Sequence, residues 1–499
     1  MELQFKRHTH TCLDAVVRDI RNMELTQEIR LPDGMPDIGH ILCAWGQTVL
    51  RGKEWRSDSI SFSGGMMVWV LYVPEDGSGE QCMESWIPFQ MRWDLPEDCP
   101  DGKMRIHCIA RFVDARSVSA RKIMVRAGTA AQAEAFAPRA VELWEPEKTP
   151  ENVELLRTKW PVRMSVEAGE KSFLMDEELD LPGAAAMPEK LISFRLDPRL
   201  TEKKVVGNKL VFRGNGNLHV LCRCAGGQFQ SWDLEIPFSQ FADLEDTYET
   251  DAQGNLVLSP TSLELELGEN GHLRFKGGVV VQYQITDRRL LSAAEDAYSP
   301  GRELQLRREM TQVPAVLEMR RENIYGEQTL TADAQRIVES VFQPDFPRQR
   351  FGENGMEAEI PGQFQVLYYT PDGTLRAGTA RWEGSVQLPA DEKTGFSFAP
   401  PATVTPRAIS GGGSITLSTE IPLEITATSE QSIPMVTGLE LGEMLPPDPD
   451  RPSLILRRAG EDRLWDIAKA SGSTMDAIRR INGISEEPAP DRMLLIPVP

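Results

Sequence analysis

The 499-residue sequence predicts a mainly β protein: three tandem β-rich units, of sandwich or open-barrel type, precede one small α+β domain. Three observations predict this class. Apolar segments with a shared Val-Leu pair recur at Val70, Val220 and Val366, at spacings of 150 and 146 residues. Polar and apolar residues alternate with period two around these segments, as in half-buried strands. A proline-rich segment then separates the repeats from a C-terminal stretch with helical periodicity.

The repeat extends beyond the Val-Leu pairs. Residues 87–89 (Ile-Pro-Phe) return as residues 236–238, and residues 16–31 align without gaps with residues 315–330. Features that keep the same order and phase indicate copies of one structural unit. We therefore expect β units at residues 1–150, 151–311 and 312–444, the third with the most degenerate sequence.

Each unit is expected to contain one short helix after its Leu-Pro element. The three helices are predicted at 36–43, 188–194 and 333–342, because proline is tolerated in a first helical turn. Central strands and a closing strand should follow, separated by turns. The Asp-Gly pairs at 76–77 and 372–373 are typical of such turns.

Residues 445–452 (LPPDPDRP) contain four prolines and predict a stiff, non-helical linker. Residues 453–499 then predict the order β-α-α-β. Asp462 is the expected N-cap of the first helix, and Gly472 should end it. Ser473 or Thr474 should cap the second helix, which would point Met475, Ile478 and Ile481 inward.

The C-terminal stretch resembles a LysM domain. The resemblance is carried by residues 464–469 (LWDIAK), 472–474 (GST), 481–484 (INGI) and 494–497 (LLIP). It implies a shallow groove between two loops, which in this family usually binds N-acetylglucosamine polymers such as peptidoglycan. By resemblance, the groove residues are Asp462, Arg463, Leu464, Trp465, Asn482, Gly483, Ile484, Pro490, Asp491 and Arg492.

Two positions in the groove depart from the family pattern. Glu461 stands where the family usually has glycine before aspartate, and Asp491-Arg492 replace the usual Gly-Gln after Pro490. Glycine lets backbone approach a ligand closely, whereas these side chains add bulk and charge. The departures favour a protein partner over a glycan. Trp465 has two interpretations, a side chain covering the small core or a binding anchor at the groove rim.

The upstream units resemble SPOCS domains of spore-forming bacteria, and the segment at 30–42 (RLPDGMPDIGHIL) carries this resemblance best. SPOCS units followed by one LysM domain imply a scaffold for spore coat assembly. Such a scaffold is made in the mother-cell cytoplasm and placed at the forespore surface. Its LysM domain is expected to bind a coat morphogenetic protein similar to stage IV sporulation protein A. The alternative is an anchor that binds peptidoglycan.

Composition excludes several classes of protein. The formal charge of −21 argues against binding to nucleic acid or to anionic membranes, which would repel the chain. No apolar run approaches the roughly 20 residues that span a bilayer, so no membrane insertion is expected. The first residues resemble no signal peptide, and seven cysteines fit a reducing cytosol.

Two groups of soft ligands merit attention as metal sites: His8, His10 and Cys12, and His219, Cys222 and Cys224. Neither group has a fourth ligand positioned by the sequence, and no other unit repeats either one, so we interpret them as ordinary strand residues. Glycines 411–413 indicate a hairpin rather than a phosphate loop. No catalytic motif stands out, and we expect no enzyme and no cofactor. A hydrolase tethered by its LysM domain is the weakest alternative.

Overall fold

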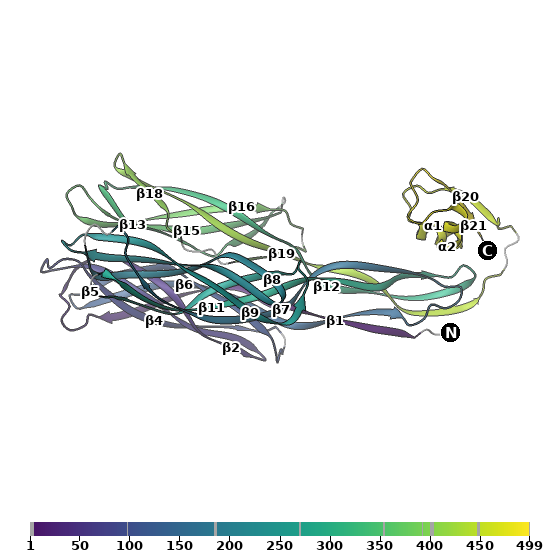
Figure 1. Ribbon diagram of the computed structural model, residues 1–499, viewed down its shortest axis with the longest axis horizontal. Coiled ribbons are helices and arrows are strands. Elements are labelled where there is room, and N and C mark those ends of the chain that lie inside the picture. Colours follow the sequence, from purple (N-terminus) through teal and green to yellow (C-terminus); the bar gives the residue numbers. More distant parts are fainter. Residues whose placement is uncertain are drawn as a thin grey trace.

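The computed structural model describes residues 4–96, 98–183, 187–268, 271–352, 355–391, 393–399, 404–446 and 450–498. The protein is mainly β, as predicted. Figure 1 shows a β-rich head, a stalk of long strands that projects from it, and a small domain beside the stalk tip. We call this small domain, residues 453–498, the C-terminal module.

The first unit contains β1 (Phe5–Arg30), β2 (Ile38–Arg56), β3 (Ser59–Pro74), β4 (Gln81–Asp94), β5 (Lys103–Ser119) and β6 (Lys122–Pro146). The second contains β7 (Glu154–Leu179), β8 (Pro188–Cys224), β9 (Phe229–Tyr248), β10 (Gln253–Leu267) and β11 (Leu273–Tyr298). The third contains β12 (Arg302–Thr331), β13 (Arg336–Pro344), β14 (Arg348–Gly352), β15 (Gly355–Tyr369), β16 (Leu375–Leu388), β17 (Gly395–Phe398), β18 (Arg407–Gly411) and β19 (Ser414–Met444). The module contains β20 (Leu454–Arg458), α1 (Leu464–Ser471), α2 (Met475–Asn482) and β21 (Met493–Pro497).

One pattern of strand pairing recurs in the three units. The first strand of each unit pairs antiparallel with the last, and a shorter strand pairs with the other edge of that last strand. These sheets are β1-β6-β5, β7-β11-β10 and β12-β19-β17, with β18 also on β19. The middle strands form a second sheet in each unit. Each unit is therefore built from two sheets, in keeping with the β-rich class predicted.

The short helices predicted at 36–43, 188–194 and 333–342 are wrong. These segments belong to β2, β8 and β13. β2 pairs along its length with β3, and β13 pairs with β15, so the apolar residues of both segments become sheet positions. Short apolar runs do not distinguish strand from helix by periodicity, and proline is also compatible with the first residue of a strand.

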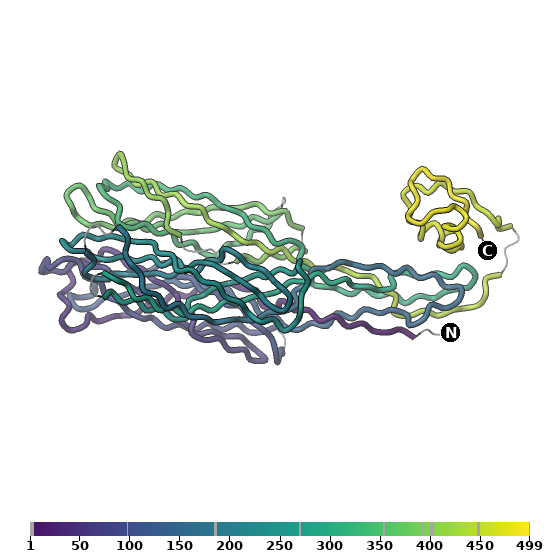
Figure 2. Tube along the Cα trace, viewed as in Figure 1, coloured from purple at the N-terminus to yellow at the C-terminus, as the bar shows by residue number. Residues whose placement is uncertain are grey.

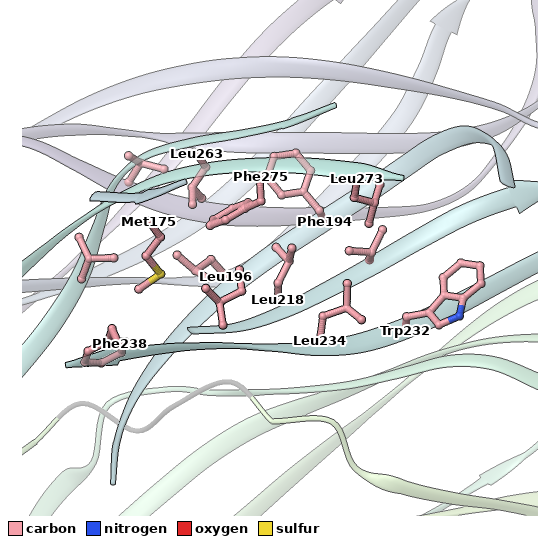
Figure 3. Close-up of a cluster of buried hydrophobic side chains, with 14 of the residues drawn as sticks. Met175, Phe194, Leu196, Leu218, Trp232, Leu234, Phe238, Leu263, Leu273 and Phe275 are labelled. Carbon is pink, nitrogen blue, oxygen red and sulfur yellow. The ribbon is translucent and has the colours of Figure 1, made fainter. Parts of the chain in front are cut away.

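The second unit has the largest core, in which side chains from its two sheets interdigitate (Figure 3). Met175 and Phe275 come from one sheet, and Phe194 and Trp232 from the other. The same core continues into the neighbouring units, because Trp69 of the first unit stacks edge-on against Phe194 at 5.3 Å. The three units thus share buried surface and do not form separate globules.

Buried side-chain amides join the first two units. Gln47 donates to the carbonyl of Leu196 at 2.6 Å and accepts from its N–H at 3.0 Å. Gln282 makes the same pair of hydrogen bonds with Ile106, at 2.6 and 2.8 Å. Each amide satisfies a buried peptide unit that no neighbouring strand reaches.

The stalk consists of three two-stranded ribbons, β1–β6, β7–β11 and β12–β19, which leave the head side by side (Figures 1 and 2). Every ribbon contributes apolar side chains to one core. Its members are Cys12, Val141, Leu143, Val162, Met164, Leu291, Ala293, Val313, Ala315, Ile433 and Met435. A single ribbon of this kind would be marginally stable in water, so the shared core is what holds the stalk together.

A β-bulge interrupts the first strand of each unit at a similar distance along the repeat. The pairing registers of β1, β7 and β12 skip Val16, Val166 and Leu317. These positions are 150 and 151 residues apart (166 − 16 and 317 − 166). Each follows the residues that pack in the stalk core. Because a bulge bends and twists its strand, it changes the direction of the ribbon where head and stalk meet.

The expected boundary between residues 311 and 312 falls inside β12, whose pairing with β19 begins at Arg302. The predicted linker at 445–452 lies partly outside the described residues. Among the described helices, none has the length and apolar character needed to cross a bilayer.

Candidate partner-binding site

The C-terminal module has the predicted order β-α-α-β, and β20 pairs antiparallel with β21. Its core includes Leu464, Ile467 and Ala468 from α1, Ile478 from α2, and Leu494 from β21. The second helix differs in one respect from the prediction. Ile478 is fully buried and Met475 partly so, but Ile481 is 46% exposed.

The helix ends are mostly as predicted. Gly472 adopts the left-handed conformation with φ of 58° at the end of α1, and the Thr474 hydroxyl accepts from the Ala477 N–H at 3.1 Å. The predicted Asp462 cap is wrong, because Arg463 holds the N-cap position and its side chain makes no capping bond. Asp462 instead pairs with Arg457.

Glu487 supplies the missing cap from the other loop. One of its carboxylate oxygens accepts from the Leu464 N–H at 2.8 Å, at the start of α1. Negative charge at a helix N-terminus satisfies an unpaired donor and the helix dipole together. The signal for this contact was absent from the local sequence, since 23 residues separate the partners.

The two loops of the expected groove do lie side by side. The Gly460 N–H donates to the Pro490 carbonyl at 2.8 Å, and the Ala459 N–H donates to the Arg492 carbonyl at 2.9 Å. Asp462 and Asp491 are exposed at this junction. The structure therefore brings together the first loop and the loop before β21.

Other expected groove residues have structural contacts. The Leu464 side chain is fully buried in the core. The Asn482 amide accepts from the Leu495 N–H at 2.9 Å and donates to its carbonyl at 2.6 Å, which extends the sheet beyond β21. Gly483 ends α2 with a φ of 57°, and Ile484 packs against the core.

Trp465 contacts the chain's own stalk. Its side chain is 1% exposed, its ring lies edge-on to Tyr298 of β11 at 4.8 Å, and its Nε1 donates to Asp296 at 3.0 Å. Trp465 belongs to the module core, as in the first interpretation, and its contact outside the module is with the chain's own stalk. The anchored surface is the stalk tip.

Asp296 is the centre of the contact between module and stalk. Lys469 Nζ lies 2.6 Å from its carboxylate, and Arg308 of β12 pairs with the other oxygen. Burial raises the pKa of Asp296, but the hydrogen bonds from Lys469 and Trp465 outweigh this effect and hold it below its usual range. Asp296 therefore stays ionised at neutral pH and binds four donors, the fourth being the backbone N–H of Ala297.

Two further contacts flank Asp296. Arg463 Nη1 lies 3.6 Å from Glu295, and its Nε donates to Asp466 at 3.0 Å. The Tyr298 hydroxyl donates to the Ser473 carbonyl at 2.9 Å. We call Glu295, Asp296 and Tyr298 the stalk-tip triplet. Sequence reasoning missed all three, because they are distant from the module in sequence. The pairing of β11 with β7 skips Glu295, so an irregularity of the strand lies within the triplet.

In the second group of soft ligands, His219 belongs to an ion-pair cluster, whereas Cys222 and Cys224 lie in the hydrophobic core. His219 Nδ1 lies 2.7 Å from Asp233, and Nε2 lies 2.7 Å from Glu339 of the third unit. Burial lowers the pKa of His219, but the two carboxylates raise it more, so the net shift is upward. Burial raises the pKa of Cys222 to about 12, so this residue remains a thiol.

In the first group, Cys12 lies in the stalk core and His8 is 3.9 Å from Glu145. Burial raises the pKa of Cys12 to about 11. No set of three or more His, Cys, Asp or Glu side chains is arranged to hold a metal ion within the described part of the chain.

The chain was compared with protein-family models, with curated proteins and with solved structures, and none of the three comparisons finds a match.

Proposed function

We propose that the protein is a non-enzymatic scaffold in spore coat assembly, whose C-terminal module binds a coat morphogenetic protein at the forespore surface. The observation that carries the proposal is the position of the module, which lies beside the tip of a stalk built from all three units (Figure 1). A rigid stalk of shared-core ribbons suits the task of holding a small binding module away from a large head.

The sequence resemblance supplies the biological setting. SPOCS units followed by one LysM domain resemble SipL, the protein that interacts with stage IV sporulation protein A. The proposed partner is a protein of that kind. In this setting the protein works in the cytoplasm of the mother cell.

A glycan-binding anchor is the second candidate, favoured by the adjacent loops that hold Gly460 and Pro490. Two features of the groove favour the protein partner instead. Glu487 already occupies the N–H of Leu464, and Trp465 is buried against the stalk, so neither group can receive a sugar without rearrangement.

One experiment separates the two candidates. Purified full-length protein is tested for retention on peptidoglycan and, in parallel, on immobilised stage IV sporulation protein A. The scaffold proposal expects saturable binding to the protein and none to the glycan. Retention on peptidoglycan alone would support the anchor and refute the scaffold.

A further inference from the structure

The outer face of the module's sheet is apolar and uncovered. In β20 and β21, alternate residues point away from the core, and these are Leu454, Leu456, Met493 and Leu495. Leu456 is paired with Leu495 across the sheet, so the four side chains share one face. Their exposed fractions are 47%, 63%, 49% and 36% respectively. We call them the outer apolar face.

This face is unusual for so small a domain. A single exposed leucine needs no explanation, but adjacent exposed apolar residues on one sheet face indicate a contact surface. α1 and the stalk cover a different side of the module, through Trp465 and Lys469. No described segment of the chain covers the outer apolar face, and β20 pairs on one edge only within the described sheet.

The charges beside the face indicate the chemistry of its partner. Arg458 continues the same side of β20, opposite Met493. It is exposed and has no ion-pair partner among the described residues. On its other side, the module already pairs Lys469 and Arg463 with carboxylates of the stalk. An unpaired arginine at an apolar face favours a carboxylate on an incoming chain.

We infer that the outer apolar face binds an acidic amphipathic segment of a partner protein. Its apolar side chains would cover Leu456 and Leu495, and a carboxylate would pair with Arg458. The inference deepens the proposed function, since it names the surface and the partner chemistry. It also moves the contact away from the predicted groove residues Arg463 and Trp465, which the stalk already engages.

The test measures binding of full-length variants to immobilised stage IV sporulation protein A. Leu456→Ser and Leu495→Ser remove outward side chains and leave the core intact, so folding should be unaffected. Each should weaken binding by about tenfold or more, the effect typical of an interface anchor. Arg458→Glu should weaken binding to a similar extent by placing like charges together.

Two matched variants serve as controls. Leu317→Ser changes a leucine of similar exposure (58%) in the bulge of β12. Arg376→Glu reverses an exposed arginine of β16 that has no ion-pair partner among the described residues. Both should bind within about twofold of the wild type.

Each result decides a different point. If the wild type binds and the outer-face variants bind equally well, the inference is wrong and the proposed function stands. If the wild type does not bind, the proposed function fails and the inference fails with it. If sedimentation shows that the wild type self-associates and that Leu456→Ser abolishes this, the face binds a second copy, and the assignment to an acidic partner is overturned.

Discussion

At the scale of single residues, buried polar side chains connect parts of the chain that are far apart in sequence. Gln47 and Gln282 each bond to the backbone of another repeat. Within the module, Asn482 bonds in the same way to the backbone of Leu495. Asp296 joins the stalk to α1. Such groups stabilise only when fully partnered, because an unpaired buried donor or acceptor costs about 1–3 kcal/mol.

Asp296→Asn should loosen the docking of the module. The variant loses the charge that binds Lys469 and Arg308, and the contact should weaken by about 1–3 kcal/mol. Hydrogen exchange measured by mass spectrometry should increase in α1 and around Tyr298. The control is Asp176→Asn, because Asp176 is exposed and lies 4.0 Å from its two basic neighbours. Equal exchange in wild type and Asp296→Asn would show that this carboxylate does not hold the module.

The His219 cluster should make stability depend on pH. The folded-state pKa of His219 is raised above its ordinary value of 6.5, so protonation favours the folded protein. Its contribution is present below that ordinary value and is lost as pH rises through the folded pKa. Asp233 and Glu339 favour the cation, and Arg195 opposes it.

The thermal midpoint of the wild type should therefore decrease as pH rises above 6.5, the ordinary pKa of His219. His219→Gln should show a smaller fall, whereas the exposed control His272→Gln should behave like the wild type. A midpoint with the same pH dependence in wild type and His219→Gln would contradict this account.

The helix caps show which contacts of the module can be predicted from neighbouring residues in the sequence. Gly472 and Thr474 were predictable because a cap depends on one residue and its near neighbours. Glu487 and Asp296 were not, because their partners come from other loops or another unit. The groove loops were predicted together by resemblance, but nothing local indicated that the stalk would cover Trp465.

At the scale of elements, the long ribbons depend on bulges that recur with the repeat. Val16, Val166 and Leu317 each add one residue to the first strand of a unit, between stalk and head. The match between residues 16–31 and 315–330 was readable from the sequence. The bulges were not, because one extra residue shifts the order of inward and outward side chains without a distinct residue pattern of its own. The misassigned helices at the start of β2, β8 and β13 share this limit: short segments take their conformation from the strands beside them.

Deletion of Leu317 should destabilise the third unit strongly. Without the bulge, the residues of β12 on one side of it change faces, and buried positions such as Val313 and Ala315 point outward. We expect a loss of at least about 3 kcal/mol in the free energy of unfolding, measured by urea denaturation. Leu317→Ser retains the bulge and should change stability by less than about 0.5 kcal/mol. A deletion variant as stable as the wild type would mean that the bulge does not fix the register.

At the scale of the whole molecule, three sequence repeats form one body. The repeat itself was predictable from sequence, and so was the β-rich character of each unit. The core shared by Trp69 and Phe194 was not predictable, and neither was the common stalk core. A strand face that packs against a neighbouring unit is as apolar as one that packs inside its own unit, so the sequence does not distinguish the two.

Limited proteolysis should first cut the chain within residues 445–452. This segment is rich in proline, whereas the connections between units are short. The fragment from residue 453 to 499 should stay folded and elute with the body in gel filtration, held by the stalk-tip triplet. In Asp296→Asn, the cut fragment should elute separately. A first cut between the β units, near residue 150 or 300, would contradict this picture.

The ribbon that leads to the module also has a mechanical consequence. β19 runs from the head to the stalk tip, and the chain continues from its end toward the module (Figure 1). A pull on the module, with the head held in place, acts along β19. The hydrogen bonds to β12 lie perpendicular to that direction, so they resist in shear, all at once and not one after another. The stalk is thus suited to carry tension between two attached assemblies without peeling apart.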